Sequence, residues 1–270
     1  MKFSILIAHY NNDIYFKDCF NSIVNQSFQD FEVIIVDDCS DKKSIDVVKN
    51  IIKNDLRFKF FQNHINNGVG FTKNKCIELA SGEICGFLDP DDSLRKDALE
   101  LMIQFFKKNE CVAIYSKMML SDANLLPLKY FNRTKQIING DKYFFNVNNN
   151  ITHFFVFKKS VYNQTEKINV SLRRAEDQDL YLKLYEKGRI LFINECLYNY
   201  RLHNQGLTQG NDKGKNEFLL VIKESLKRRK IFKYENIDDN ELYNKLIDKE
   251  ISIYKRIKRY YLNCRLTYKT

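Results

Sequence analysis

The chain has 270 residues, 44% hydrophobic residues and a formal net charge of +10. This length suits one large domain, or one domain with an appendage, and allows a sizeable core. No stretch approaches the roughly 18 uninterrupted apolar residues of a membrane-spanning helix. The seven scattered cysteines form neither a disulfide framework nor a zinc motif. The apolar opening, residues 1–8, is too short for a signal peptide, so we expect a cytoplasmic protein with reduced thiols.

The first third of the chain alternates short apolar runs with amphipathic segments. We predict strands at residues 3–8, 31–36, 58–61 and 84–88, separated by three helices. Near-continuous apolar strands between helices indicate a parallel sheet that is covered on both faces. Ligands of such sheets bind beyond the carboxyl ends of the strands. Polar clusters stand at these ends, at residues 9–11, 37–38, 66–68 and 89–92.

The last of these clusters carries the strongest chemical signal. The apolar run 84–88 ends in Asp89, Asp91 and Asp92, arranged around Pro90. In an extended backbone Asp89 and Asp91 point the same way. Mg²⁺ and Mn²⁺ prefer oxygen ligands and commonly take one or two carboxylates together with substrate phosphates. The cluster therefore predicts a metal site that holds a phosphorylated ligand; the structural alternative is an acidic turn that caps the next helix through Asp92 or Ser93.

The rest of the chain is less regular. We predict a helix with an apolar face from Leu94 to Phe105, a strand at 111–115, an irregular and substrate-facing insertion at 117–150, and a strand at 152–157. Residues 176–179 open a further helix. Two short strands are expected at 189–194 and 196–201, followed by a polar loop at 201–208. Gly206, Gly210 and Gly214 mark a boundary before a helical remainder.

These clusters, in this order, resemble the family 2 glycosyltransferases with the GT-A fold. The likeness runs from residue 3 to about residue 208. The motifs are the opening at 4–11, the strand end at 37–40, the loop at 67–74, the acidic stretch at 82–92, the pair 176–177, and the loop at 200–203. The resemblance implies an α/β domain with a mixed, mainly parallel, Rossmann-like sheet. It implies sugar transfer from a nucleotide-diphosphate donor to an acceptor hydroxyl, usually with inversion.

The resemblance also implies a role for single residues. Tyr10 and Asp38 would hold the nucleobase, Asp89 the ribose, and Arg201 the diphosphate. The full set expected to bind the donor is Ala8, Tyr10, Asp38, Asn67, Lys73, Asp89 and Arg201.

The metal and the base complete this set. The resemblance implies that Asp91, with His203, binds Mn²⁺ or Mg²⁺, and that Asp177 is the general base. A divalent ion beside Arg201 would meet the charge that grows on a leaving diphosphate. A carboxylate at a helix N-terminus can take the proton of the acceptor hydroxyl on the opposite face of the sugar.

The sequence departs from the family pattern at three places. The opening usually reads Pro-Thr-Tyr-Asn, whereas Ala8 and His9 occupy the first two positions here. Lys73 stands where the family usually has arginine, and lysine lacks the bidentate guanidinium fork. Pro90 separates the two aspartates but leaves both carboxylates in place.

Taken singly, several of these residues have structural explanations. Tyr10 could pack beside the first helix, and Asp37 is expected to be structural. The pair 176–177 could be an acidic first helical turn favoured by the helix dipole. His64 and His153 have no recognisable partner in the sequence and are expected to be structural.

The end of the chain is basic. Residues 211–270 contain 16 Lys and Arg against 9 Asp and Glu, which supplies +7 of the net charge. The last twenty residues have no acid, and aromatic and aliphatic residues interleave with the bases. One interpretation is a solvated helix that covers the catalytic domain. The other is attachment to anionic lipid head groups; nucleic-acid binding is not expected without a known module.

We therefore predict a GT-A domain at 1–210 and a basic helical extension at 211–270. The expected function is inverting, metal-dependent transfer from a UDP-sugar to a glycan or lipid-linked acceptor in bacterial surface polysaccharide synthesis. The expected location is the cytoplasm, peripheral to the inner face of the membrane. The alternatives are a sugar nucleotidyltransferase, for which the glycine-rich phosphate loop after the first strand is missing, and an inactive membrane adaptor that kept the fold.

Overall fold

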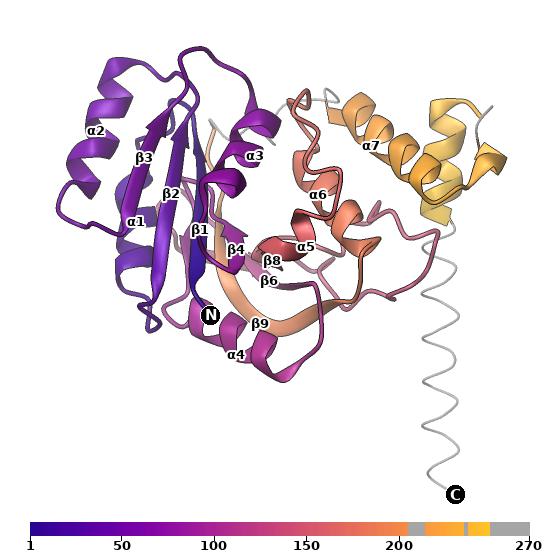
Figure 1. The fold of residues 1–270 in the computed structure, drawn as a ribbon, viewed down its shortest axis with the longest axis horizontal. Coiled ribbons are helices and arrows are strands. Elements are labelled where there is room, and N and C mark those ends of the chain that lie inside the picture. Colours follow the sequence, from indigo (N-terminus) through magenta and orange to yellow (C-terminus); the bar gives the residue numbers. More distant parts are fainter. Residues whose placement is uncertain (205–213, 235–236, 249–270) are drawn as a thin grey trace, which may run out of the picture.

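A computed structural model describes residues 1–204, 214–234 and 237–248 (Figure 1). The first half alternates strands and helices as predicted. Strands β1, β2, β3 and β4 are parallel, in the order β3-β2-β1-β4. The elements are β1 (Phe3–His9), α1 (Phe16–Val24), β2 (Phe31–Asp37), α2 (Lys42–Ile52), β3 (Phe58–Gln62), α3 (Val69–Leu79) and β4 (Ile84–Phe87).

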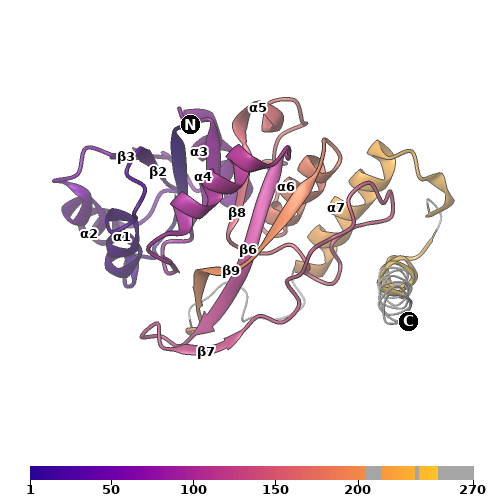
Figure 2. The same cartoon turned by 90° about the horizontal axis from the view of Figure 1, so that it is seen from below.

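The second half continues the same sheet with strands of both directions. β8 is antiparallel to β4 and β6, β9 runs parallel to β6, and the short β5 is antiparallel to β9. Figure 2 shows the long strands β6 and β9 side by side, with β7 at one edge. The elements are β5 (Ser93–Leu94), α4 (Ala98–Lys108), β6 (Ala113–Ser121), β7 (Pro127–Tyr130), β8 (Phe155–Lys158), α5 (Lys159–Tyr162), α6 (Glu176–Tyr185), β9 (Ile190–Arg201) and α7 (Lys215–Arg228).

Helices cover both faces of the sheet, which confirms the predicted fold class. Along β1 the buried side chains alternate between two core clusters: Leu6 belongs to one, and Ile5 and Ile7 belong to the other. The first cluster includes apolar residues of α3, α6 and α7, and the second includes those of α1, α2 and α4. A strand that is apolar on both sides therefore reflects a sheet buried on both faces.

Three sequence-based boundaries were wrong. The two strands expected at 189–194 and 196–201 are one strand, β9; residues 194–195 form a β-bulge, because Ser116 pairs with Ile193 and Lys117 pairs with Cys196. Leu94 belongs to a strand paired with β9 and not to the helix, whose periodicity it happens to match. The segment 117–150 is partly regular, since β6 extends to residue 121 and β7 follows; β7 is exposed throughout, so it has no burial pattern to recognise.

The described part of the C-terminal extension packs on the same core. Val221, Ile222 and Leu226 of α7 are buried beside α6. Glu186, just after α6, accepts hydrogen bonds from the guanidinium groups of Arg228 and Arg229. The basic segment 250–270, with its predicted lipid attachment, lies outside the described residues. Within the described ranges no helix has the length and apolarity to cross a membrane, and the six cysteines there are free.

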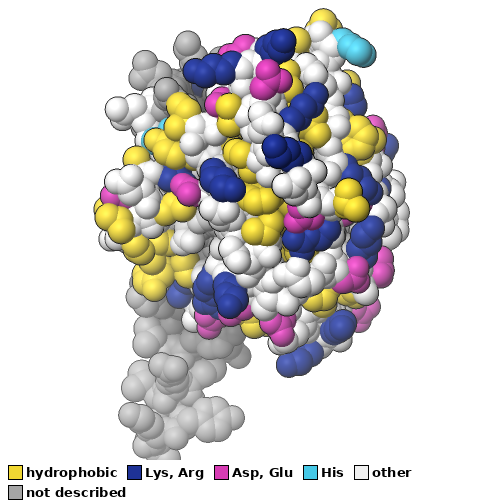
Figure 3. Space-filling model, turned by 90° about the vertical axis from the view of Figure 1, so that its left-hand side faces the viewer, with side chains coloured by type: hydrophobic (Ala, Val, Ile, Leu, Met, Phe, Trp, Pro, Cys, Tyr) yellow, Lys and Arg dark blue, Asp and Glu magenta, His cyan; other side chains and the backbone are white. Residues whose placement is uncertain are grey.

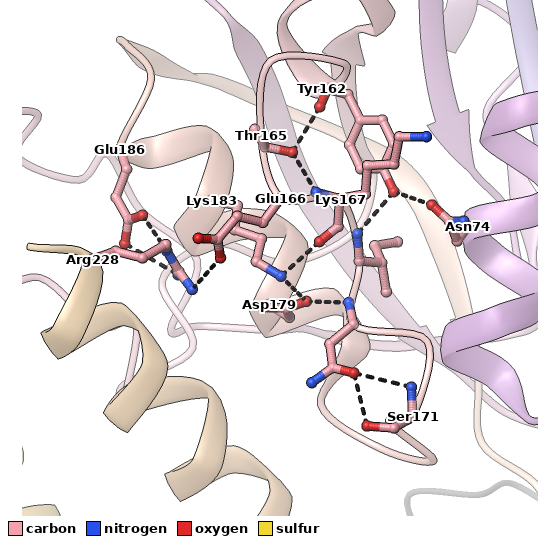
Figure 4. Close-up of polar contacts among 12 residues, drawn as sticks. Asn74, Tyr162, Thr165, Glu166, Lys167, Ser171, Asp179, Lys183, Glu186 and Arg228 are labelled. Carbon is pink, nitrogen blue, oxygen red and sulfur yellow. Dashed lines mark hydrogen bonds and ion pairs between the residues drawn. The ribbon is translucent and has the colours of Figure 1, made fainter.

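A cavity of about 420 Å³ lies between α6, α7 and the loop before α6. Figure 4 shows its polar wall: the ammonium of Lys183 contacts the carboxylate of Asp179 and the carbonyl of Lys167, and Glu166 faces Arg228. Residues two positions apart on a helix point roughly 200° apart, so Asp179 and the cavity lie on a different side of α6 from Asp177. The cavity is therefore separate from the predicted catalytic residues.

The net positive charge is not concentrated on the side that carries α1 and α2. Seen from that side, Lys and Arg side chains alternate with Asp and Glu, and apolar side chains lie between them (Figure 3). This mixture agrees with the near balance of charges over the first 210 residues.

Candidate functional site

The parallel register of β1 and β2 places His9 opposite Asp37 at the carboxyl edge of the sheet. Both side chains are fully buried, and His9 Nδ1 lies 2.8 Å from Asp37 Oδ1. Burial raises the pKa of Asp37, but hydrogen bonds from His9 and from Ser40 outweigh burial, so this pKa lies below its usual value. Asp37 therefore orders the turn between β2 and α2, in keeping with its expected structural role.

The carboxylate of the neighbouring Asp38 holds the loop that leads into α3. It accepts hydrogen bonds from the side-chain amide of Asn63 and from the backbone amides of Asn67 and Gly68, at 2.7–2.9 Å. Gly68 has φ of +90°, a conformation that glycine adopts without strain. Asp38 is only 3% exposed, so the protein uses most of its hydrogen-bonding capacity; its contact with a nucleobase stays a prediction.

The other residues predicted near the base line the same rim. The backbone amide of Asp38 donates to the carbonyl of His9, which connects the end of β2 to the end of β1 beside Ala8. Tyr10 follows in the next loop and is 52% exposed. Ala8, Tyr10, Asp38 and Asn67 thus belong to loops that hydrogen bonds join at one edge of the sheet, with the Tyr10 ring free to contact a ligand.

The three carboxylates of the acidic turn after β4, Asp89, Asp91 and Asp92, differ in their burial. Asp92 is buried and accepts hydrogen bonds from the Tyr198 hydroxyl at 2.6 Å and from the backbone amide of Arg201 at 2.7 Å. Burial, together with the charges of Asp91 and Asp89, raises the pKa of Asp92 well above its usual value. Helix α4 starts only at residue 98, so the alternative in which Asp92 or Ser93 caps that helix is wrong.

Asp89 and Asp91 differ from Asp92 because they are partly exposed. The side chain of Asp89 has no hydrogen-bond partner among the described residues, which leaves its carboxylate available to a ligand. Asp91 Oδ2 lies 2.8 Å from Nε2 of His203. His203 is in turn packed on the ring of Tyr15, with ring centroids 4.8 Å apart. The predicted metal pair is therefore assembled from two segments far apart in sequence.

The distance between Asp91 and His203 fits a shared divalent ion. Neighbouring ligands of an octahedral ion, each at about 2.1 Å, lie about 3 Å apart, close to the 2.8 Å observed. Within the described residues no group of three or more His, Cys, Asp and Glu side chains converges. Two protein ligands plus phosphate oxygens and water form a common environment for such ions, so the donor set suits an ion bound together with a diphosphate.

Arg201 is oriented toward protein groups and is almost fully buried. Its Nε donates to the carbonyl of Asp91 at 2.6 Å, one Nη lies 2.8 Å from the carboxylate of Asp18, and the other contacts the carbonyl of Ala123. Its guanidinium also stacks on Tyr15, 4.2 Å from the ring centroid. Arg201 therefore holds the backbone of the acidic turn in place through the carbonyl of Asp91. Its contact with a diphosphate stays a prediction.

The predicted base lies at the start of α6, where Lys73 reaches it from α3. The Lys73 ammonium is 2.7 Å from Asp177 Oδ1 and 2.8 Å from Glu176 Oε1. Burial lowers the pKa of Lys73, but the charges of Asp177 and Glu176 outweigh it, so the pKa lies well above its usual value. Lys73 is thus a permanent cation beside Asp177, and its predicted donor contact stays a prediction.

Sequence reasoning missed two residues of this site. His153 Nε2 lies 3.7 Å from Asp177 Oδ2, although His153 was expected to be structural. Its ring stacks on Tyr198, with centroids 5.1 Å apart. Tyr198 in turn accepts a hydrogen bond from the backbone amide of Asp89. Neither residue belongs to a motif; the only signal in the sequence was that a tyrosine and a histidine occur in otherwise apolar strand segments.

The arrangement therefore combines a rim of strand-end loops, a pair suited to a divalent ion, and a carboxylate held beside a cation. The sequence model of the family described as Glycosyl transferase family 2 matches residues 4–165. Chondroitin synthase of Pasteurella multocida is 30% identical over 94% of this chain and 27% of its own length. The putative teichuronic acid biosynthesis glycosyltransferase TuaG of Bacillus subtilis is 29% identical over 82% of this chain and 87% of its own.

This chain spans only about a quarter to a third of the first relatives it matches. Among solved structures, S. aureus TarS in complex with UDP-GlcNAc aligns with a TM-score of 0.70 at 22% identity, over 91% of this chain and 70% of TarS. A Pyrobaculum calidifontis mannosyltransferase in complex with GDP-Man and Mn²⁺ aligns with a TM-score of 0.59 at 12% identity, over 84% and 62%. These two likenesses confirm the GT-A fold. The match of the family model to more than half of the chain shows that it belongs to glycosyl transferase family 2.

Proposed function

We propose that this chain transfers a sugar from a nucleotide-diphosphate donor, a UDP-sugar, to an acceptor hydroxyl with inversion. One observation carries the proposal: Asp91 in the turn after β4 lies 2.8 Å from His203. Tyr198 and His153 connect this turn to Asp177, whose carboxylate contacts the ammonium of Lys73. The UDP-GlcNAc complex of TarS and the GDP-Man complex of the mannosyltransferase support a nucleotide-sugar donor for the shared fold.

The donor would bind along the rim formed by these strand-end loops. The exposed ring of Tyr10 offers a surface for the base, and the free carboxylate of Asp89 can accept hydrogen bonds from ribose hydroxyls. Asp38 and Asn67 would act by fixing the loop around the base. Arg201 would act by holding the backbone of the acidic turn in place.

Mn²⁺ or Mg²⁺ would be held by Asp91 and His203. When bound, such an ion supplies positive charge at the diphosphate, which stabilises the leaving group. The Mn²⁺ complex of the mannosyltransferase supports this choice of ion. The buried packing of His203 against Tyr15 keeps one of the two ligands in a fixed orientation before the donor arrives.

Asp177 would accept the proton of the attacking hydroxyl. Lys73 occupies Oδ1, so Oδ2 is the atom available for proton transfer. The Lys73 ammonium would also fix the orientation of the carboxylate that acts as the base. Attack from the Asp177 side and departure of the diphosphate on the Asp91 side would invert the configuration at the sugar carbon.

The acceptor is proposed to be a glycan or a lipid-linked glycan in bacterial surface polysaccharide synthesis, because the relatives include a chondroitin synthase and a teichuronic acid glycosyltransferase. The proposed location is the cytoplasmic face of the membrane, with residues 250–270 on anionic lipid. Liposome co-sedimentation with and without these residues tests this location; equal binding of both forms contradicts it.

The activity is tested by release of UDP from a panel of UDP-hexoses and UDP-N-acetylhexosamines with Mn²⁺. We expect Asp91→Ala to lose UDP affinity and at least about 100-fold in turnover, because removal of a main electrostatic contact costs a few kcal/mol. Asp46→Ala, at an exposed position on α2, is the matched control. Unchanged turnover and affinity in Asp91→Ala would contradict the site. Formation of a nucleotide sugar from a sugar phosphate and a nucleoside triphosphate would favour the nucleotidyltransferase alternative.

A further inference from the structure

The side chains of His153 and Asp177 approach each other at the start of α6. His153 Nε2 and Asp177 Oδ2 are 3.7 Å apart, which is too long for a hydrogen bond. Within the described part of the chain, Asp177 Oδ2 accepts no hydrogen bond, either from His153 or from any other residue. An oxygen atom placed about 2.8 Å from each of the two atoms would hydrogen bond to both. Such an oxygen would lie to one side of the line that joins the two atoms, and we call this position the notch.

The notch is open to solvent on one side and fixed on the other. The side chains of His153 and Asp177 are 16% and 25% exposed, whereas Lys73, on the far side of Asp177, is 4% exposed. Lys73 holds the carboxylate through Oδ1, and the stack on Tyr198 holds the imidazole. Both walls are thus positioned before any ligand enters.

The notch also lies next to the acidic turn. The Tyr198 ring that stacks on His153 carries the hydroxyl that contacts Asp92 and the backbone amide of Asp89. One aromatic ring therefore separates the notch from the residues proposed to hold the donor. A group bound in the notch would lie within reach of the donor sugar.

From this geometry we infer that His153 is a catalytic residue that binds the attacking hydroxyl together with Asp177; the inference rests on the proposed glycosyl transfer. With its proton on Nε2, His153 donates a hydrogen bond to the hydroxyl oxygen, and the hydroxyl donates to Asp177 Oδ2. The oxygen keeps one lone pair for attack on the sugar carbon. Its bond to that carbon forms as the bond from carbon to the diphosphate oxygen breaks; the proton passes to Asp177 and the electron pair leaves with the diphosphate.

Two bonds to the nucleophile fix its direction as well as its distance, which is a large part of what an active site contributes to rate. Loss of the His153 contact should therefore lower kcat and leave the affinity for the donor unchanged. When no acceptor is added, water occupies the notch as nucleophile, so release of UDP from the donor alone reports on the same contact.

The test compares three variants at position 153 in the full chain. His153→Phe keeps an aromatic ring against Tyr198 and removes the nitrogen; we expect kcat for UDP release to fall about 10- to 100-fold, the range for one lost hydrogen bond in the transition state. His153→Gln can place an amide N–H near the position of Nε2 and should recover most of that loss. His153→Ala removes both the ring and the nitrogen and should be at least as slow as His153→Phe.

The control is Lys107→Phe, which introduces the same side chain at an exposed position on α4 and should leave kcat unchanged. UDP affinity in the presence of Mn²⁺ should stay within about twofold for all variants, and thermal unfolding checks that each is folded. Full turnover in His153→Phe would overturn the inference. Equal losses in His153→Gln and His153→Phe would show that an N–H near the position of Nε2 does not restore turnover, and a parallel loss of UDP affinity would assign the effect to the acidic turn; either result also overturns the inference.

The outcomes separate the inference from the function. If Asp177→Asn abolishes UDP release and His153→Phe does not, the proposed function stands and the role of His153 fails. If the wild-type chain binds none of the nucleotides and releases no UDP from any donor in the panel, both fail together.

Discussion

The ammonium of Lys73 lies between the two carboxylates that open α6, 2.7 Å from Asp177 and 2.8 Å from Glu176. Helices α3 and α6 are thereby joined by a cation that is 3% exposed. Two adjacent carboxylates without this cation would repel each other and would lack a partner for the ionised form. Lys73 therefore both stabilises the fold and prepares the proposed base.

Replacement of Lys73 by an apolar residue of similar length should reveal both roles. We expect Lys73→Met to lower the free energy of unfolding by about 3 kcal/mol, the low end of the range for breaking a buried ion pair, because Asp177 is 25% exposed. Turnover should fall as well, since Oδ1 of the base loses its partner. Urea unfolding and UDP release measure the two effects.

Two further substitutions check this interpretation. Lys73→Arg keeps the charge and restores the residue usual in the family, so it should lose less stability and less turnover than Lys73→Met. Lys43→Met, at an exposed position on α2, should change neither quantity. A Lys73→Met variant as stable and as active as the wild type would show that the contact is incidental.

Gly68 should be required by its backbone conformation and its surroundings. Its φ is +90°, and a Cβ there would lie 2.2 Å from Nη1 of Arg173, which is bonded to Asn66. We expect Gly68→Ala to cost about 2 kcal/mol in the free energy of unfolding, from backbone strain and the displaced arginine. Because the Gly68 amide donates to Asp38, UDP affinity should also fall, by about tenfold.

Gly140 provides the matched control for Gly68. Its φ is +81°, yet a Cβ there would have no neighbour within 4 Å. Gly140→Ala should therefore cost only the conformational term, about 1 kcal/mol, and leave UDP affinity unchanged. Equal effects of the two substitutions on affinity, measured by calorimetry with Mn²⁺, would argue against a link between the 63–68 loop and the donor.

Local patterns predicted the fold well because its first half is built from local rules. Apolar runs and helical spacing predicted β1 to β4 and the helices between them, and a parallel sheet then brings the ends of these strands to one edge. The structure adds the register of β1 and β2, which places His9 beside Asp37. Long-range pairings were harder: Leu94 matched helical spacing, but its pairing with β9 determines its conformation.

The candidate site shows a similar division. The motif order singled out Asp91, Asp177 and His203 as candidates, and the structure brings Asp91 to 2.8 Å from His203. The motif order did not reveal that the Arg201 guanidinium turns inward to Asp18 and the carbonyl of Asp91. It also gave no reason to pair His153 with Asp177, since their contact depends on where the segment before β8 passes the start of α6. Side-chain direction at strand ends is set by tertiary packing, and no spacing in the sequence encodes it.

Glu32 on β2 makes the stability of the sheet depend on pH. It is 3% exposed and accepts hydrogen bonds from Ser4 and Lys59, both at 2.7 Å, and from Ser81. Burial raises the pKa of Glu32, but the hydrogen bonds from Lys59, Ser4 and Ser81 outweigh it and hold the pKa at about 2, against an ordinary value of 4.5. As the pH falls, Glu32 is therefore protonated at a higher pH in the unfolded chain than in the folded chain.

The depressed pKa fixes the sign of the effect. The contribution of Glu32 is complete above about pH 4.5 and is lost as the pH falls toward 2, and its size is about 3 kcal/mol. Urea unfolding from pH 7 to pH 2 measures it: Glu32→Gln should be less stable than the wild type at pH 7, and the difference should shrink as the solution becomes acidic. Glu83→Gln, at a side chain that is 66% exposed, should show no such convergence. A difference between Glu32→Gln and the wild type that stays constant across this range would mean that Glu32 titrates alike in the folded and unfolded chains.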